Sequence, residues 1–246
     1  MSRKYFVILG LFLVAGFLFL NTNSVLAADR YWTGNQSTST MGGVDFWNPS
    51  NWDTAVPAAG DDVWLFATSS SAVVAIASST VIISTPVDLG VGKIYVGYNQ
   101  KGNSLANSSA PFTVIIREGA SLTNRNLFEV GTSSTILLAS GSLSVGTTTM
   151  KQYASTTIHS VTGATSTVTI KGDWTFLGGA TYTSPSNSTT TITGTTQANT
   201  ITSTSTTALT FGYLVFDGAG GGTTNLQAST TVANRLSIAA GRTLDA

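Results

Sequence analysis

Residues that could do acid–base or metal chemistry are few and scattered in this chain of 246 residues. It holds one histidine, His159, and no cysteine. His159 lies in the phrase TTIHSV, where apolar and polar residues alternate as on a strand, so we interpret it as a strand-surface residue. A single histidine among many serines does not define a Ser-His-Asp triad. We therefore predict a protein that is not an enzyme, with no catalytic residue, no cofactor and no zinc or redox-metal site.

The acidic residues offer two weaker possibilities. A polysaccharide-cleaving β-helix needs carboxylates gathered on one sheet face, two of them acting as acid and base. Glu118, Glu129 and Asp173 would have to meet on one face for this function, which we rank last. Calcium binds carboxylate and carbonyl oxygens, and four aspartates fall in one loop-rich zone: Asp45, Asp53, Asp61 and Asp62. They form no Asp-x-Asp-x-Asp or nonapeptide pattern, so calcium stays a minor alternative.

Tryptophans are concentrated near the start of the chain, between Asp29 and Phe66. Four of the five lie there: Trp32, Trp47, Trp52 and Trp64. An exposed indole can stack on a sugar ring, so these four are candidate glycan-stacking residues. The interpretation we favour is that they fill the core of a compact cap. Trp174 lies in a later repeat phrase, and we expect it to stack inside the structure.

The rest of the chain is built of short alternating phrases. From Thr156 to the end, β-branched residues alternate with polar ones and are followed by Gly, Asn or Ser. Before that, glycines separate predicted strands at 73–76, 81–83, 93–96, 112–116, 127–130, 136–138 and 143–145. After residue 27 no window keeps helical apolar spacing, because glycines and β-branched residues interrupt it. The sequence therefore predicts an all-β protein.

The first 27 residues predict export. Arg3 and Lys4 precede an apolar run from Tyr5 to Leu20, and Val-Leu-Ala ends the segment before Ala28. This is the pattern of a secretory signal peptide, with an uncleaved membrane anchor as the alternative. We expect a secreted or cell-surface location, with no membrane span after cleavage. Basic and acidic residues number 11 each, and no basic stripe exists, so a nucleic-acid partner is not expected.

Strand spacing alone leaves two all-β folds open. Strands about 8 to 12 residues apart fit a β-sandwich, whereas phrases without hairpin turns fit a β-solenoid. Two-residue hairpin signals are almost missing, and Asp217-Gly218 is the one instance. Three phrases, at 118–122, 140–145 and 240–244, place a small residue and glycine before a short strand. That pattern suits the corner of a coil.

Two stretches carry a family resemblance. Within residues 172–245, four phrases follow in order: GDW (172–174), TITGT (191–195), YLVF (213–216) and LSIAAGRTLD (236–245). Residues 31–66 add WTG, W-N-x-x-N-W, a proline and GDDVWLF. These phrases resemble the repeat modules of large bacterial surface proteins of adhesin or autotransporter-passenger type. Residues 67–171 match them in general pattern alone.

The resemblance implies a right-handed parallel β-helix with coils of about 20 or more residues. We expect a signal peptide at 1–27, a Trp-rich N-terminal cap at 28–66 and solenoid repeats at 67–246 that continue or pair beyond the C-terminus. The implied function is that of a non-enzymatic structural or adhesin-like surface protein. Its partners would be a surface glycan, a protein, or another solenoid end. The alternative is an extracellular carbohydrate-binding module that uses the Trp-rich region.

Overall fold

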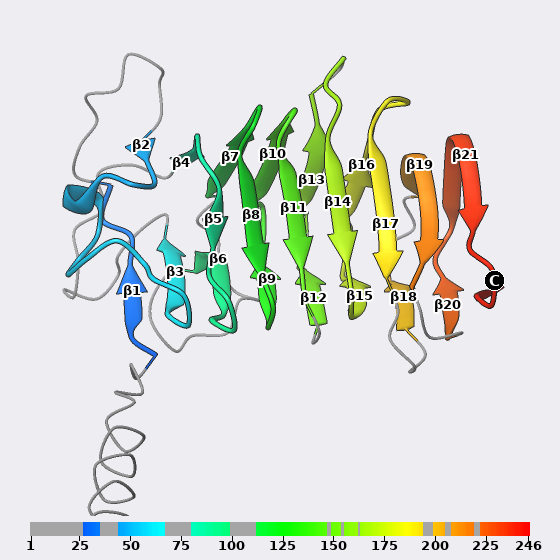
Figure 1. Ribbon diagram of the computed structural model, residues 1–246, viewed down its shortest axis with the longest axis horizontal. Coiled ribbons are helices and arrows are strands. Elements are labelled where there is room, and N and C mark those ends of the chain that lie inside the picture. Colours follow the sequence, from blue (N-terminus) through cyan, green and yellow to red (C-terminus); the bar gives the residue numbers. More distant parts are fainter. Residues whose placement is uncertain are drawn as a thin grey trace, which may run out of the picture.

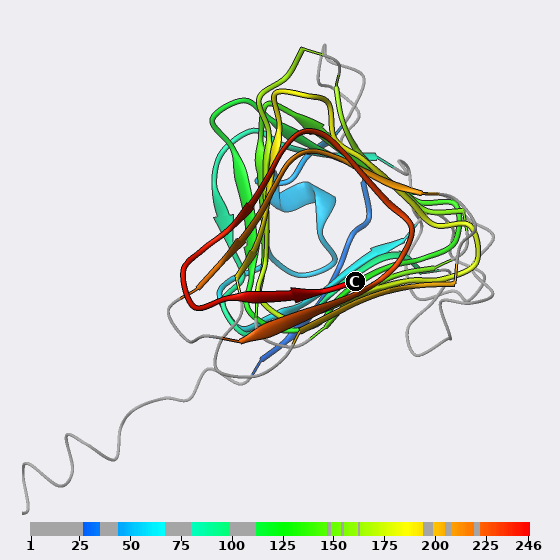
Figure 2. The ribbon, with the colours of Figure 1, turned by 90° about the vertical axis from the view of Figure 1, so that its right-hand side faces the viewer.

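A parallel β-helix forms the body of the protein in the computed structural model (Figure 1). The structure describes residues 27–34, 44–66, 80–98, 112–146, 149–153, 155–161, 163–193, 199–204, 208–218 and 222–246. The predicted signal peptide and the strand predicted at 73–76 lie outside these ranges, apart from Ala27. Viewed along its axis, the solenoid is right-handed and triangular in outline (Figure 2).

Three faces make up the triangle, and we call them A, B and C. Face A is a nine-stranded parallel sheet: β1 (Asp29–Tyr31), β3 (Asp62–Phe66), β6 (Ile94–Tyr98), β9 (Phe128–Val130), β12 (Thr149–Gln152), β15 (Asp173–Phe176), β18 (Asn199–Ser203), β20 (Thr223–Gln227) and β22 (Thr243–Asp245). The other two faces belong to one thirteen-stranded sheet.

Face B contains β2 (Val44–Asp45), β4 (Thr80–Ile83), β7 (Thr113–Arg117), β10 (Thr135–Ala139), β13 (Thr157–Ser160) and β16 (Thr181–Thr183). Face C contains β5 (Val87–Asp88), β8 (Ser121–Asn124), β11 (Ser142–Val145), β14 (Thr167–Ile170) and β17 (Thr189–Thr193). Two long strands, β19 (Leu209–Asp217) and β21 (Thr230–Ile238), run along both faces and join them. The chain therefore visits faces A, B and C in turn.

Alternation along each strand decides what lies inside. Strand β10, TILLA, is buried at every second residue, as the two-residue period of a strand requires. Because the strands of successive coils are in register, the buried residues line up in inward columns. One such column consists of Phe128, Met150, Trp174 and Ile201. Burying each large apolar side chain stabilises the fold by about 1.5–3 kcal/mol. The inward columns are the core.

Polar residues close the corners of the coils. Ser188 Oγ donates to the Ala164 carbonyl at 3.1 Å, and Ser166 Oγ donates to the Leu138 carbonyl at 3.3 Å. Each bond reaches back to an earlier coil. The Ala164 carbonyl, which lies between β13 and β14, thereby gains a partner, and the Leu138 carbonyl accepts this second bond in addition to the one from the Val161 amide.

The structure confirms the predicted fold and rejects the sandwich, because every pair of named strands is parallel. The one helical element among the described residues is a short 3-10 turn, η1 (Pro49–Asn51), whose start is capped by the Asn48 side chain. The Trp-rich segment begins at face A, since β1 and β3 pair with each other and β3 pairs with β6. The aromatic packing described below supports its role as a cap.

Candidate functional site

Two of the four candidate tryptophans form the core of the N-terminal end. Trp32 and Trp52 are joined by an antiparallel bridge, and their rings meet edge to face at 5.1 Å. Trp52 Nε1 donates to the Phe46 carbonyl at 2.8 Å, and Phe46 lies against the Trp52 ring at 5.0 Å. Their exposed fractions are 0% for Trp32 and 4% for Trp52. Neither indole offers a face to a sugar.

Trp64 belongs to an aromatic stack on the outer side of face A. Its ring lies 4.1 Å from Tyr95 and 6.2 Å from Tyr31, both in near-parallel orientation. The three residues are register partners on β1, β3 and β6. Trp64 Nε1 donates to Asp29 Oδ1 at 3.1 Å. Burial, with the nearby carboxylates of Asp62, Glu129 and Asp29, raises the pKa of Tyr95 to about 12, so its phenol stays neutral.

Trp47 is the exposed member of the set. Forty per cent of its surface is open, although Phe46 packs against one edge at 5.6 Å. Its amide donates to Asp45 Oδ1 at 3.1 Å, which fixes the turn that carries it. Glycan stacking requires an open indole face, so in this structure the glycan-binding alternative depends on Trp47.

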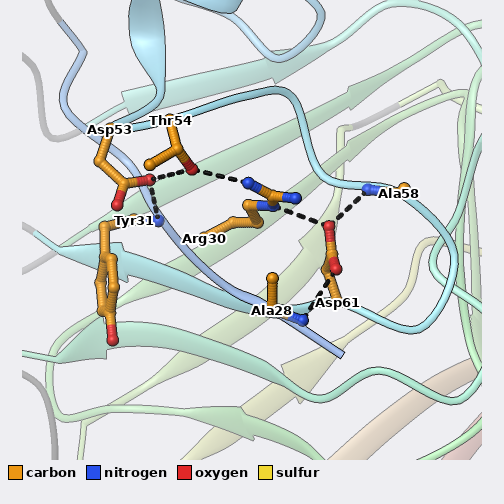
Figure 3. Close-up of polar contacts among 7 residues, drawn as sticks. All are labelled: Ala28, Arg30, Tyr31, Asp53, Thr54, Ala58 and Asp61. Atoms are coloured by element: carbon orange, nitrogen blue, oxygen red, sulfur yellow. Dashed lines mark hydrogen bonds and ion pairs between the residues drawn. The ribbon is translucent and has the colours of Figure 1, made fainter. Parts of the chain in front are cut away.

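The aspartates of the predicted calcium zone are engaged separately. Asp61, 1% exposed, accepts hydrogen bonds from Arg30 Nε at 2.8 Å and from the amides of Ala28 and Ala58 at 3.0 Å each (Figure 3). Asp53 Oδ1 accepts from the Tyr31 amide at 3.1 Å. No group of three or more metal-ligating side chains gathers anywhere in the described part of the chain. Asp61 thus ties β1 to the loop before β3.

The other two aspartates of this zone, Asp45 and Asp62, also have partners close to them. Asp45 holds the Trp47 turn, whereas Asp62 accepts from the Lys93 amide at 2.9 Å and lies 3.7 Å from Lys93 Nζ. Each of the four carboxylates therefore has a local structural role.

The three acids considered for polysaccharide cleavage do not share a face. Glu118 lies in the turn after β7, between faces B and C, whereas Glu129 and Asp173 lie on face A. Glu129 pairs with Lys151 at 3.6 Å, and Asp173 Oδ1 accepts from the Thr200 amide at 2.9 Å. The clustering that would favour this function is therefore missing from these residues.

His159 faces outward on β13, where its register partners are Leu137 and Thr183. Its Nδ1 is buried without a hydrogen-bond partner. Burial lowers the pKa of the imidazole. The residue belongs to the strand surface, as the sequence predicts, in a partly apolar row.

Two rows of hydroxyl side chains on face C are the feature that sequence reasoning did not locate. Ser121, Ser142, Thr167 and Thr189 form one row of register partners, and Thr123, Ser144, Thr169 and Thr191 form the second. We call these residues the face C hydroxyl array. The sequence pattern that could have located these rows is the repeat of S-x-S, S-x-T and T-x-T phrases. Which of these hydroxyl residues lie side by side, however, depends on the coil register.

At the C-terminal end of the described solenoid, two apolar residues in the inward columns are exposed to solvent. Leu236 is 46% exposed and Ile238 is 44% exposed, although their register partners Leu214 and Phe216 are buried. Arg242, 7% exposed, donates from Nη2 to Thr224 Oγ1 at 3.0 Å, whereas its Nε and Nη1 have no partner. This end therefore carries both apolar surface and unsatisfied donors.

Comparisons of the chain with protein-family models, with curated proteins and with solved structures give no match. The class of protein is therefore defined by the fold and the surfaces of this chain alone. Its fold and surfaces define a three-faced parallel β-solenoid. Within the described residues, no helix is long and apolar enough to cross a membrane.

Proposed function

We propose that this chain is a non-enzymatic structural or adhesin-like β-solenoid that a bacterium exports to its surface or surroundings. The observation that carries the proposal is a continuous apolar core combined with outward rows of short hydroxyl side chains. A body of this kind acts passively. Stacked coils supply length and stiffness, and repeated weak contacts add up along the rows.

Two further features support export and surface use. The basic and apolar start of the chain has the pattern of a signal peptide. The phrases at 172–245 resemble surface-protein repeats. The partners we propose are a surface glycan or protein along the faces, and a second solenoid at the end that exposes Leu236 and Ile238.

Export is tested by expressing the full chain in a bacterial host and sequencing the product found outside the cytoplasm. We expect a mature N-terminus near Ala28. Intact chain confined to the cytoplasm would contradict export.

Adhesion is tested with beads coated with the exported protein. The beads should attach to immobilised cell-envelope glycans or proteins in proportion to coating density, and no sugar or peptide should be released. Product release would contradict the non-enzymatic part of the proposal.

Carbohydrate binding through the Trp-rich region is the second candidate, and the exposure of Trp47 is the observation that favours it. On a glycan array, Trp47→Ala should abolish any binding that depends on the indole while circular dichroism stays unchanged. Val91→Ala is the matched control, since Val91 is 68% exposed on the same N-terminal half. Equal binding by both variants would remove this candidate.

A further inference from the structure

The face C hydroxyl array has a regular two-dimensional geometry. Its residues lie on β8, β11, β14 and β17, which run side by side in the same direction (Figure 1). Register is unbroken through all four strands, so from β8 to β14 each hydroxyl residue has a hydroxyl residue next to it on the following coil. Strands in a sheet lie about 4.8 Å apart, and every second residue along a strand lies about 6.6 Å further on. The array is therefore a lattice with these two repeats.

The hydroxyls of the array are free to bind something outside the protein. Apart from Ser142, whose Oγ lies 3.5 Å from the Ala120 carbonyl, they have no hydrogen-bond partner in the described part of the chain. Inward hydroxyls differ, because Ser166, Ser188 and Thr190 are all bonded. The outward donors and acceptors must then be satisfied by solvent or by a partner.

No other described row of the solenoid has the same character. On face B, a threonine row on β4, β7, β10, β13 and β16 lies beside the apolar row of Ile82, Ile115 and Leu137. On face A, the row that begins with Tyr31 and Trp64 continues through Glu129 and Lys151. Between β8 and β17 the face C array contains neither a charged nor a large apolar side chain. Its rows are bordered by Asp88 on β5 and by Tyr213 and Val215 on β19.

These properties limit the chemical classes of partner that can bind to the array. A charged partner would find no opposite charge in the array. An apolar surface would bury hydroxyls without hydrogen bonds, at a cost of about 1–3 kcal/mol for each group. A partner that fits must be neutral, must donate and accept hydrogen bonds, and must repeat in two directions as the array does.

Water molecules in ice meet these conditions. Each water donates and accepts hydrogen bonds, as each hydroxyl does, and the surface of an ice crystal presents its water molecules in a two-dimensional repeat. The threonine side chains add stiffness, because β-branching restricts χ1 and the backbone ladder holds the Cα positions. The array can thus order water before contact with the crystal.

We propose that face C is an ice-binding surface, on which the face C hydroxyl array holds a layer of water in register with the ice lattice. The inference deepens the proposed function by naming a partner for one face. It rests on that proposal for the contact of the face with water outside the cell.

The test grows ice slowly from a solution of the full chain and measures the protein in the ice relative to the liquid, alongside inhibition of ice recrystallisation. We expect enrichment in ice for the unaltered chain. The double variant Thr169→Lys with Thr191→Lys should reduce enrichment by about tenfold or more, since contacts in one array act together. The matched control is Thr175→Lys with Thr202→Lys, a register pair on face A, which should keep the enrichment.

Circular dichroism and the melting temperature establish that each variant is folded. If the lysine pair on face C melts early, Thr169→Tyr with Thr191→Tyr replaces it, because tyrosine suits an exposed strand. Exclusion of the unaltered chain from ice, or equal loss in the face A and face C variants, would overturn the inference. Bead adhesion to glycan or protein layers without ice enrichment would leave the proposed function standing and reject ice as the partner.

Discussion

Trp174 Nε1 donates a 3.0 Å hydrogen bond to Gln152 Oε1, and the two side chains lie on neighbouring coils inside the core. Both are fully buried. The Gln152 amide nitrogen donates in turn to the Thr181 carbonyl at 3.2 Å. Tyr182 packs edge to face on the indole at 4.9 Å. A polar residue can lie among these aromatic rings because its hydrogen-bonding groups are satisfied.

Replacing Gln152 by methionine removes the acceptor and leaves the indole N–H buried without a partner. We expect the free energy of unfolding to fall by about 1–3 kcal/mol. The double variant Gln152→Met with Trp174→Phe should lose less than the sum of the two single variants, because the orphaned donor is gone. Urea denaturation of all four proteins measures the coupling. Additive losses would show that the bond contributes nothing.

Alternation made most strands on faces B and C predictable. The strands expected at 112–116, 136–138 and 143–145 correspond to β7 (Thr113–Arg117), β10 (Thr135–Ala139) and β11 (Ser142–Val145). Strand β12, TMKQ, was not predicted because one of its two inward residues is Gln152 rather than an apolar residue. Its place in the core depends on Trp174, 22 residues later.

The surface array was harder to predict than the strands. Its residues are individually ordinary, and their alignment depends on corners of different length. The hydrogen bond from the Phe112 amide to Ser134 Oγ spans 22 residues, whereas the bond from the Gly212 amide to Ser184 Oγ spans 28. Sequence periodicity does not specify how such corners compensate for each other. Trp64 does follow the alternation, since it faces outward between the inward residues Val63 and Leu65. Its stacking on Tyr95, by contrast, depends on the coil register.

Leu214 and Leu236 provide a matched pair, since they are register partners on β19 and β21. Leu214 is 1% exposed and Leu236 is 46% exposed. Leu214→Ala should destabilise the protein by about 2–5 kcal/mol. Leu236→Ala should have less than half that effect, because much of its surface is already in contact with water. Urea midpoints at low and high protein concentration check this. If Leu236→Ala destabilised the protein as much as Leu214→Ala at high protein concentration but not at low concentration, this would indicate that another molecule covers Leu236.

Gly212 lies at the corner between faces B and C, where the pairing of β19 with β21 shifts between Phe211 and Tyr213. A Cβ atom there would contact the Pro185 carbonyl oxygen and would lie 2.8 Å from the Ser188 carbonyl oxygen. Gly212→Ala should therefore lower stability by about 1–3 kcal/mol through overpacking. Gly119→Asn is the control, because its site is open and asparagine tolerates the positive φ of 74°. Equal effects would refute the steric explanation.

Asp61 should make stability depend on pH. Burial alone would raise the pKa of its carboxyl, but hydrogen bonds from the Ala58 amide, from Arg30 and from the Ala28 amide outweigh burial and hold the pKa below the usual 3.8. The unfolded chain then takes up the proton more readily than the folded chain. The contribution of Asp61 is therefore complete above pH 3.8 and is lost as the pH falls through the lower folded pKa.

Asp61→Asn should lower the free energy of unfolding by about 1–3 kcal/mol at neutral pH, because the buried hydrogen bonds to a charged acceptor are weakened. The difference from the unaltered chain should stay constant as the pH falls to about 5 and should shrink below the unfolded pKa. Asp88→Asn is the control: its carboxylate pairs with Arg125 at 2.6 Å, but both side chains are 53% exposed. Its effect should stay under about 1 kcal/mol, because solvent screens an exposed pair. A pH-independent deficit in Asp61→Asn would mean that the ionised carboxylate does not anchor β1.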